Sequence, residues 1–98
     1  MSRSIMQKDL TRCYLCGANG AQDRLELHHV FGGPLRKLAD ADGLTVMLCG
    51  VRCHRLGKLS AHNNKTIRRM LQAEAQAKFE ETHTRAEWMA RYGRNYRE

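Results

Sequence analysis

The sequence predicts a small domain of the α+β class, and three observations support this prediction. Two short runs, residues 25–30 and 44–48, have the alternating or apolar patterns of strands. The last third of the chain instead repeats apolar residues at helical spacing. Four cysteines in two pairs frame these strands, and a metal bound by them would support a small core. We therefore expect one domain over residues 1–98, with a zinc-bound core at 13–64 and a helical extension at 65–98.

The cysteine spacings are typical of a structural zinc site. Two residues separate Cys13 from Cys16, and Gly17 allows the tight turn that follows. Three residues separate Cys49 from Cys53, so the second turn has to differ from the first. We expect no signal peptide at the start of the sequence, and no apolar run approaches the roughly 20 residues of a membrane span. We expect a reducing cytoplasm in which the cysteines bind zinc; two disulfides are the alternative for an extracellular protein.

Breaks in these patterns mark the predicted ends of the elements. Gly32-Gly33-Pro34 ends the first strand, and an irregular loop of about ten residues is expected after it. Residues 57–60 form a second break. Ser60 or Asn63 is expected to cap the helix that begins at Lys65.

Two helices are predicted after this break. The apolar stripe of the first helix comprises Ile67, Met70, Leu71, Ala75 and Phe79, and its opposite face comprises Arg68, Arg69, Gln72 and Gln76. A shorter helix follows, with a capping box formed by Thr84 and Glu87 and an end at Gly93. The apolar stripe is expected to pack in the core.

The positive charge of the chain is unevenly distributed. The net charge is +7, and residues 50–98 hold eleven Lys and Arg against five Asp and Glu. Residues 1–49 hold six against five. This asymmetry favours a polyanionic partner, most simply nucleic acid, over ordinary solubility charge. The candidate phosphate contacts are Arg52, Arg55, Lys58, Arg68 and Arg69.

Histidines provide a second kind of candidate metal site. His28 and His29 lie between the cysteine pairs, His54 directly follows the last cysteine, and His62 lies further on. A neutral imidazole can bind a divalent metal or take a proton from water, and both roles serve phosphodiester hydrolysis. Adjacent residues of a regular strand point to opposite faces. The strand is therefore expected to end or twist at this doublet if both histidines reach one site.

The doublet run Leu25-Glu26-Leu27-His28-His29, the second strand and the segment from Cys49 to His54 resemble the HNH motif of the ββα-metal endonucleases. The resemblance covers residues 13–64 and is to the subset that binds zinc through four cysteines. It implies a ββα-metal, treble-clef-like zinc domain that hydrolyses DNA phosphodiesters by nicking or double-strand cleavage. The implied products carry 5′-phosphate and 3′-hydroxyl ends.

The same resemblance implies a role for each matching residue. His29 matches the general base, and His28 and His54 match ligands of a catalytic Mg²⁺ or other divalent ion. The implied ligands of the structural Zn²⁺ are Cys13, Cys16, Cys49 and Cys53. DNA is the implied partner and a bacterial host cytoplasm the implied location. Similarity of the C-terminal segments to small phage-encoded members suggests a phage origin.

The sequence departs from the family pattern at two functional positions. Where many members have a third metal ligand it has Lys58, so we expect His62 to substitute. At the position of the motif asparagine it has Gly43, and the neighbouring Asp42 is expected to orient the base. These departures keep one rival open, a non-catalytic zinc module that binds nucleic acid or protein. A cysteine redox switch is a third reading, and monomer and dimer both remain open.

Overall fold

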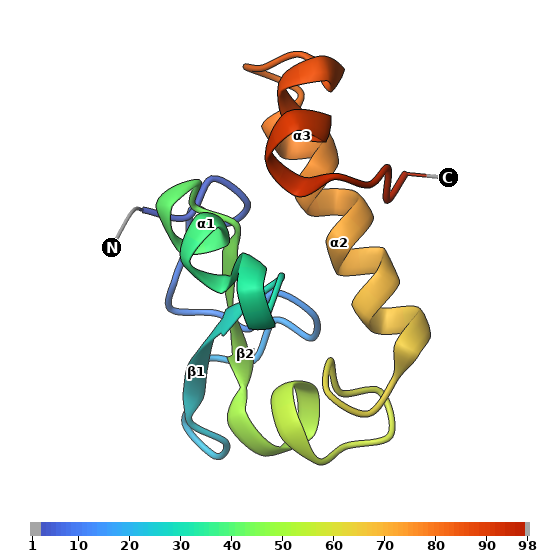
Figure 1. Cartoon of the computed structure of the whole chain (residues 1–98). Helices are drawn as coiled ribbons and strands as arrows, with labels where there is room; N and C mark the ends of the chain where they lie inside the picture. The colour runs from blue at the N-terminus through green and yellow to red at the C-terminus, as the bar shows by residue number, and fades with distance from the viewer. Residues whose placement is uncertain (1–2, 98) are drawn as a thin grey trace.

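The two predicted strands pair as an antiparallel sheet in the computed structural model, which describes residues 3–97 (Figure 1). Strand β1 spans Leu25–His29 and strand β2 spans Thr45–Cys49. Their register places Leu25 opposite Cys49 and His28 opposite Val46. The sheet therefore brings the end of the second strand, with its cysteine, beside the start of the first. The outermost residues of the expected domain, 1–2 and 98, lie outside the described part.

The connection between the strands is helical, and the expectation of an irregular loop there was wrong. It contains a 3₁₀ turn, η1 (Gly33–Leu35), and helix α1 (Arg36–Ala41). Pro34 lies in the first turn, where its fixed φ suits a helix and its missing N–H costs nothing. Gly43 then turns the chain with φ +73°, and a Cβ there would collide with the carbonyl oxygen of Arg3. An asparagine at this position would therefore not fit.

The two C-terminal helices begin and end close to their predicted positions. Helix α2 spans Lys65–Phe79, and helix α3 spans Arg85–Tyr92. The side chain of Asn64, and not Ser60 or Asn63, caps α2 by accepting the N–H of Ile67 at 3.0 Å. The predicted capping box of Thr84 and Glu87 is confirmed, as is the left-handed Gly93 after α3.

Most of the aromatic residues gather where α2, α3 and the C-terminal segment meet Phe31, two residues after the end of β1. Phe31 contacts the rings of Trp88, Tyr92 and Tyr96, and Phe79 contacts the first two of these. Trp88 is fully buried. This cluster attaches the helical extension to the core. The buried apolar residues of the predicted α2 stripe are Leu71, Ala75 and Phe79, whereas Met70 is exposed.

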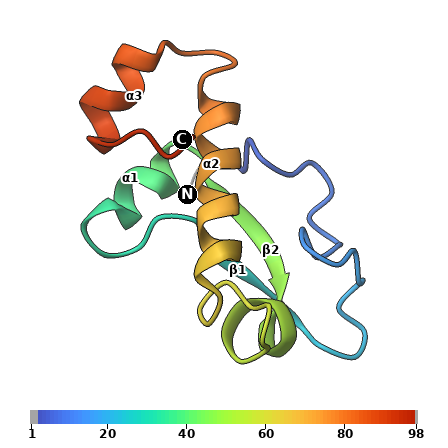
Figure 2. The ribbon, with the colours of Figure 1, turned by 90° about the vertical axis from the view of Figure 1, so that its right-hand side faces the viewer.

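Gln76 was expected on the exposed face of α2, but it is fully buried. The C-terminal segment returns along the helix (Figure 2) and covers this position. The side-chain amide of Gln76 donates to Asn95 Oδ1 at 2.9 Å and accepts the N–H of Tyr96 at 2.6 Å. A polar residue is therefore buried here because the returning backbone provides its hydrogen-bond partners.

The described residues form a small α+β fold of one two-stranded sheet and surrounding helices. None of the helices described within residues 3–97 is long and apolar enough to cross a bilayer.

Candidate metal centres

The four cysteines come together from three parts of the chain. Cys13 and Cys16 lie on the turn before β1, Cys49 ends β2, and Cys53 lies on the π-helical turn η2 (Gly50–Arg55). All four Sγ atoms lie within 4.8 Å of one another, and none forms a disulfide. Tetrahedral Zn–S bonds of about 2.3 Å place sulfurs ~3.8 Å apart, so this cluster can close around one zinc ion.

The protonation of the thiols also fits a cation at this place. Burial raises the pKa of Cys49 to about 11 and raises that of Cys53 as well. At Cys16 burial acts in the same direction, but hydrogen bonds from the Ala18 N–H, the neighbouring thiols and Arg52 outweigh it and lower the pKa to about 6. Four thiolates so close together repel one another. A divalent ion among them would allow all four to ionise.

The π-helical turn explains how the three-residue cysteine spacing is accommodated. Its wide backbone is closed by hydrogen bonds from the N–H groups of Leu56 and Gly57 to the carbonyl of Val51, at 2.9 and 3.0 Å. Gly57 approaches Arg52 so closely that a Cβ there would collide with the Arg52 backbone. This turn places Cys53 among the thiols. The next residue, His54, joins a separate group of histidines.

That second group consists of His28 from β1, His54 from η2 and His62 from the loop before α2. Their candidate ligand nitrogens lie within 4.8 Å of one another. A backbone hydrogen bond of 3.0 Å from the N–H of His62 to the carbonyl of His54 returns this loop to the site. Burial, with smaller effects from His54 and His62, lowers the pKa of His28 to about 3. Burial lowers the pKa of His62 too, so both imidazoles are neutral and offer lone pairs at neutral pH.

Glu26 is a site residue that the sequence analysis missed. Its Oε1 lies 2.9 Å from Nδ1 of His54 and 3.0 Å from Nε of Arg55. A carboxylate that accepts the Nδ1–H of a histidine leaves Nε2 free as a metal ligand and fixes the ring. The strand alternation held the signal, because residues i and i+2 share a face and Glu26 precedes His28 by two.

His29 pairs with Asp40, and the assignment of Asp42 as its orienting residue was wrong. Nε2 of His29 lies 2.9 Å from Oδ1 of Asp40 on α1. Asp42 instead accepts two hydrogen bonds from Arg91, at 2.9 and 2.6 Å, and one from the hydroxyl of Tyr92 at 2.7 Å. The difference follows from the helix between the strands, which sets Asp40 beside β1 and turns Asp42 toward α3.

All four of these histidines line one open pocket of about 400 Å³. β1 ends at His29, and the imidazoles of both His28 and His29 line the pocket. Arg36, which the sequence analysis did not single out, and Arg68 contribute positive charge to its wall. The pocket thus combines four imidazoles with two guanidinium groups, and one of the imidazoles, that of His29, pairs with Asp40 outside the lining.

The other predicted phosphate contacts lie elsewhere. Nη2 of Arg52 lies 3.2 Å from Sγ of Cys16, and Arg55 pairs with Glu26. Lys58 lines an apolar hollow beside the cysteines, and Arg69 lines a small hollow next to the histidine pocket.

Searches of protein-family models, curated proteins and solved structures matched none of them to this chain. The chemistry of the two clusters therefore has to be argued from their own geometry. The cysteines offer a closed four-thiolate site, and the histidines offer three nitrogens beside an open pocket. Closed sites are typical of structural metals, whereas a metal with three protein ligands keeps a position for water or substrate.

Proposed function

We propose that the protein is a metal-dependent endonuclease of the HNH, ββα-metal type that hydrolyses DNA phosphodiester bonds. One observation supports this more than any other. The three-histidine cluster and His29, which pairs with Asp40, border the same arginine-lined pocket. In this proposal η2 and the loop to His62 take the place of the helix that carries both later metal ligands in many members of the family.

The two clusters have separate roles in the proposal. Zinc bound by the cysteines holds η2 against the turn before β1. His28, His54 and His62 hold a divalent ion, which when bound neutralises charge on the phosphate and on the departing 3′-oxygen. Three imidazole nitrogens suit transition metals, whereas Mg²⁺ prefers oxygen ligands. This donor set therefore favours an ion such as Ni²⁺, Co²⁺ or Zn²⁺ over Mg²⁺.

His29 is the general base of the proposed reaction. The Asp40 carboxylate accepts the Nε2–H of His29, which fixes the tautomer that has its lone pair on Nδ1. Nδ1 takes a proton from water, the water oxygen bonds to phosphorus, and the P–O3′ bond breaks. The departing oxygen gains a proton, which yields 5′-phosphate and 3′-hydroxyl ends. Arg36 and Arg68 bind the non-bridging oxygens of the phosphate.

The proposal is tested with supercoiled plasmid and protein that holds one zinc per chain, incubated with Ni²⁺, Co²⁺, Mn²⁺, Mg²⁺ or no further metal. We expect nicked or linear DNA only when metal is added, and less with Mg²⁺ than with the transition metals. Product ends should accept a 5′-label only after phosphatase treatment. A folded, zinc-containing protein that cleaves neither duplex nor single-stranded DNA with any of these ions would contradict the proposal and favour a non-catalytic zinc module.

Asp40→Asn is expected to slow cleavage by about 10- to 100-fold because the amide no longer fixes the tautomer of His29. A buried carboxylate in a Ser-His-Asp arrangement contributes about 10⁴-fold, but the Asp40 side chain is 30% exposed and its effect should be smaller. Asp42→Asn is the matched control, since Asp42 binds α3 and not His29. Single-turnover cleavage rates measure both. Equal rates for the two variants would contradict the assigned role of Asp40.

A further inference from the structure

A second, smaller hollow lies beside the histidine pocket, between α2 and the C-terminal segment. It has a volume of about 140 Å³ and is lined by Arg69, Gln72, Arg94, Asn95 and Tyr96. Figure 2 shows the C-terminal segment returning to the middle of α2, which brings residues far apart in the sequence together. The sequence analysis predicted a DNA contact for only one of these five residues, Arg69.

The C-terminal wall of this hollow is fixed by hydrogen bonds. Asn95 and the backbone N–H of Tyr96 both bind the buried side chain of Gln76. The indole N–H of Trp88 donates to the carbonyl of Arg94 at 2.8 Å. The guanidinium of Arg94 itself is exposed and lies 5.3 Å from the centre of the Tyr96 ring. The backbone is thus held by buried groups while the charged side chain stays accessible.

The hollow and the histidine pocket adjoin each other, and both are lined by arginines. Gln72 lines both, and Arg68 and Arg69, one turn before it on α2, line one each. No Asp or Glu is among the residues that line either space. Within residues 3–97, Arg36, Arg69 and Arg94 form no ion pair with a carboxylate. These guanidinium groups are therefore available to an external anion.

We infer that this hollow is a second phosphate subsite, in which Arg69 and Arg94 bind a backbone phosphate of the DNA strand whose neighbouring phosphate occupies the histidine pocket. The inference rests on the proposed function. Arg68 lines the histidine pocket, the adjacent Arg69 lines the hollow, and Gln72 lines both. For this reason we place the bound phosphate next to the scissile one along the strand. Its recognition requires charge and not a particular base.

The test is the salt dependence of DNA binding, measured by fluorescence anisotropy with a 20-base-pair duplex and no added catalytic metal. Each phosphate contact contributes about 0.9 to the slope of log K against log salt concentration. Because Arg69 and Arg94 bind one phosphate together, the double variant Arg69→Gln/Arg94→Gln is expected to reduce the slope by about 0.9. Both side chains are exposed, and the variant retains the Arg94 carbonyl that Trp88 requires. Its thermal unfolding should match that of the wild type.

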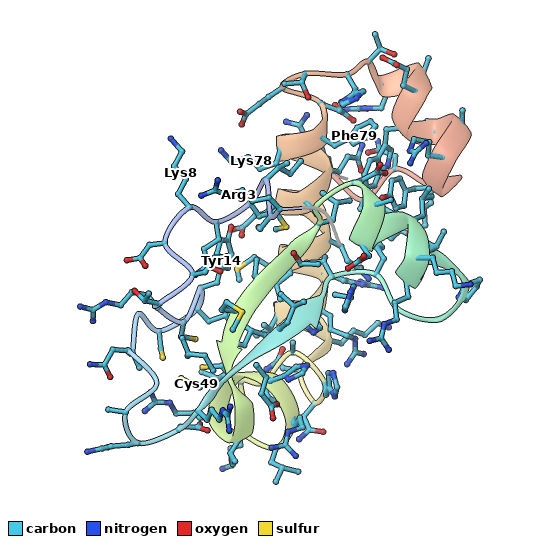
Figure 3. The ribbon with its side chains drawn as sticks, turned by 90° about the vertical axis from the view of Figure 1, so that its left-hand side faces the viewer. Arg3, Lys8, Tyr14, Cys49, Lys78 and Phe79 are labelled. Atoms are coloured by element: carbon cyan, nitrogen blue, oxygen red, sulfur yellow. The ribbon has the colours of Figure 1, made fainter. Side chains whose placement is uncertain are left out.

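The charge-matched control is Arg3→Gln/Lys8→Gln. The N-terminal segment that carries Arg3 and Lys8 (Figure 3) lies on the opposite side of the molecule from the C-terminal segment in Figure 1. The slope measured for this control variant should stay close to that of the wild type. Equal slopes for the two double variants would overturn the subsite.

Cleavage of DNA by the wild type separates the two proposals. If the wild type cleaves DNA but the two double variants have equal slopes, only the subsite is lost. A protein that never cleaves but shows the predicted difference retains the subsite as a binding surface.

Discussion

Replacing His29 by alanine is expected to lower the rate of DNA cleavage by about 10²- to 10⁴-fold, which is the usual contribution of a general base. His29 lines the pocket, pairs with Asp40 and lies outside the three-histidine cluster. Its loss should therefore remove the base and leave metal binding intact. The initial rate of plasmid nicking measures the effect. Metal titration of the same variant shows whether the three-histidine cluster still binds its ion.

His83→Ala is the matched control for this variant. His83 is exposed and stacks on Phe79, away from the pocket. The His83→Ala variant should cleave DNA at the wild-type rate at temperatures where it is folded. If His29→Ala cleaves as fast as His83→Ala, another group activates the water and the role given to His29 is wrong.

Cys53→Ser is expected to abolish the folded state. Zinc binding at structural sites contributes roughly 10 kcal/mol or more to folding, and small domains have only about 5–15 kcal/mol of stability in total. Cys53 is buried within the thiol cluster, and the same turn carries His54. Losing this ligand should therefore remove both metal centres. Thermal unfolding monitored by circular dichroism is expected to show no cooperative transition.

Metal analysis and chelation complete this test. The wild type should contain one tightly bound zinc per chain, unfold when a strong chelator removes it, and refold when zinc returns. The result that contradicts the structural role is a Cys53→Ser protein that melts cooperatively near the wild-type temperature. Zinc retained at wild-type stoichiometry by this variant would likewise show that the cysteines are not the ligands.

Local patterns were sufficient to predict most of the elements. The strand runs, the capping box at Thr84 and the glycine at position 93 act through neighbouring residues, and these predictions are confirmed. The cysteine and histidine groupings were also visible in the sequence, because metal ligands have restricted spacings. The helix α1 was missed because Gly32-Gly33-Pro34 was read only as a break. Pro34 can equally begin a helical turn.

The remaining site residues depend on contacts between distant segments. Asp40 reaches His29 only because α1 folds back beside β1. The motif position before the second strand pointed instead to Asp42, which binds α3. Gln76 is buried only because the chain returns from α3 and offers Asn95 and Tyr96 as partners. Neither contact has a local signal. Glu26 differs from them, since strand alternation alone places it on the face of His28.

The most direct test of the account is the metal concentration that half-saturates DNA cleavage, measured for the wild type, His54→Ala and His83→Ala with Ni²⁺ or Co²⁺. If the three histidines hold the metal that cleavage requires, His54→Ala raises this concentration at least tenfold. His83→Ala leaves it unchanged. Identical curves for wild type and His54→Ala, or cleavage by the wild type without added metal and in the presence of a chelator, would contradict the account.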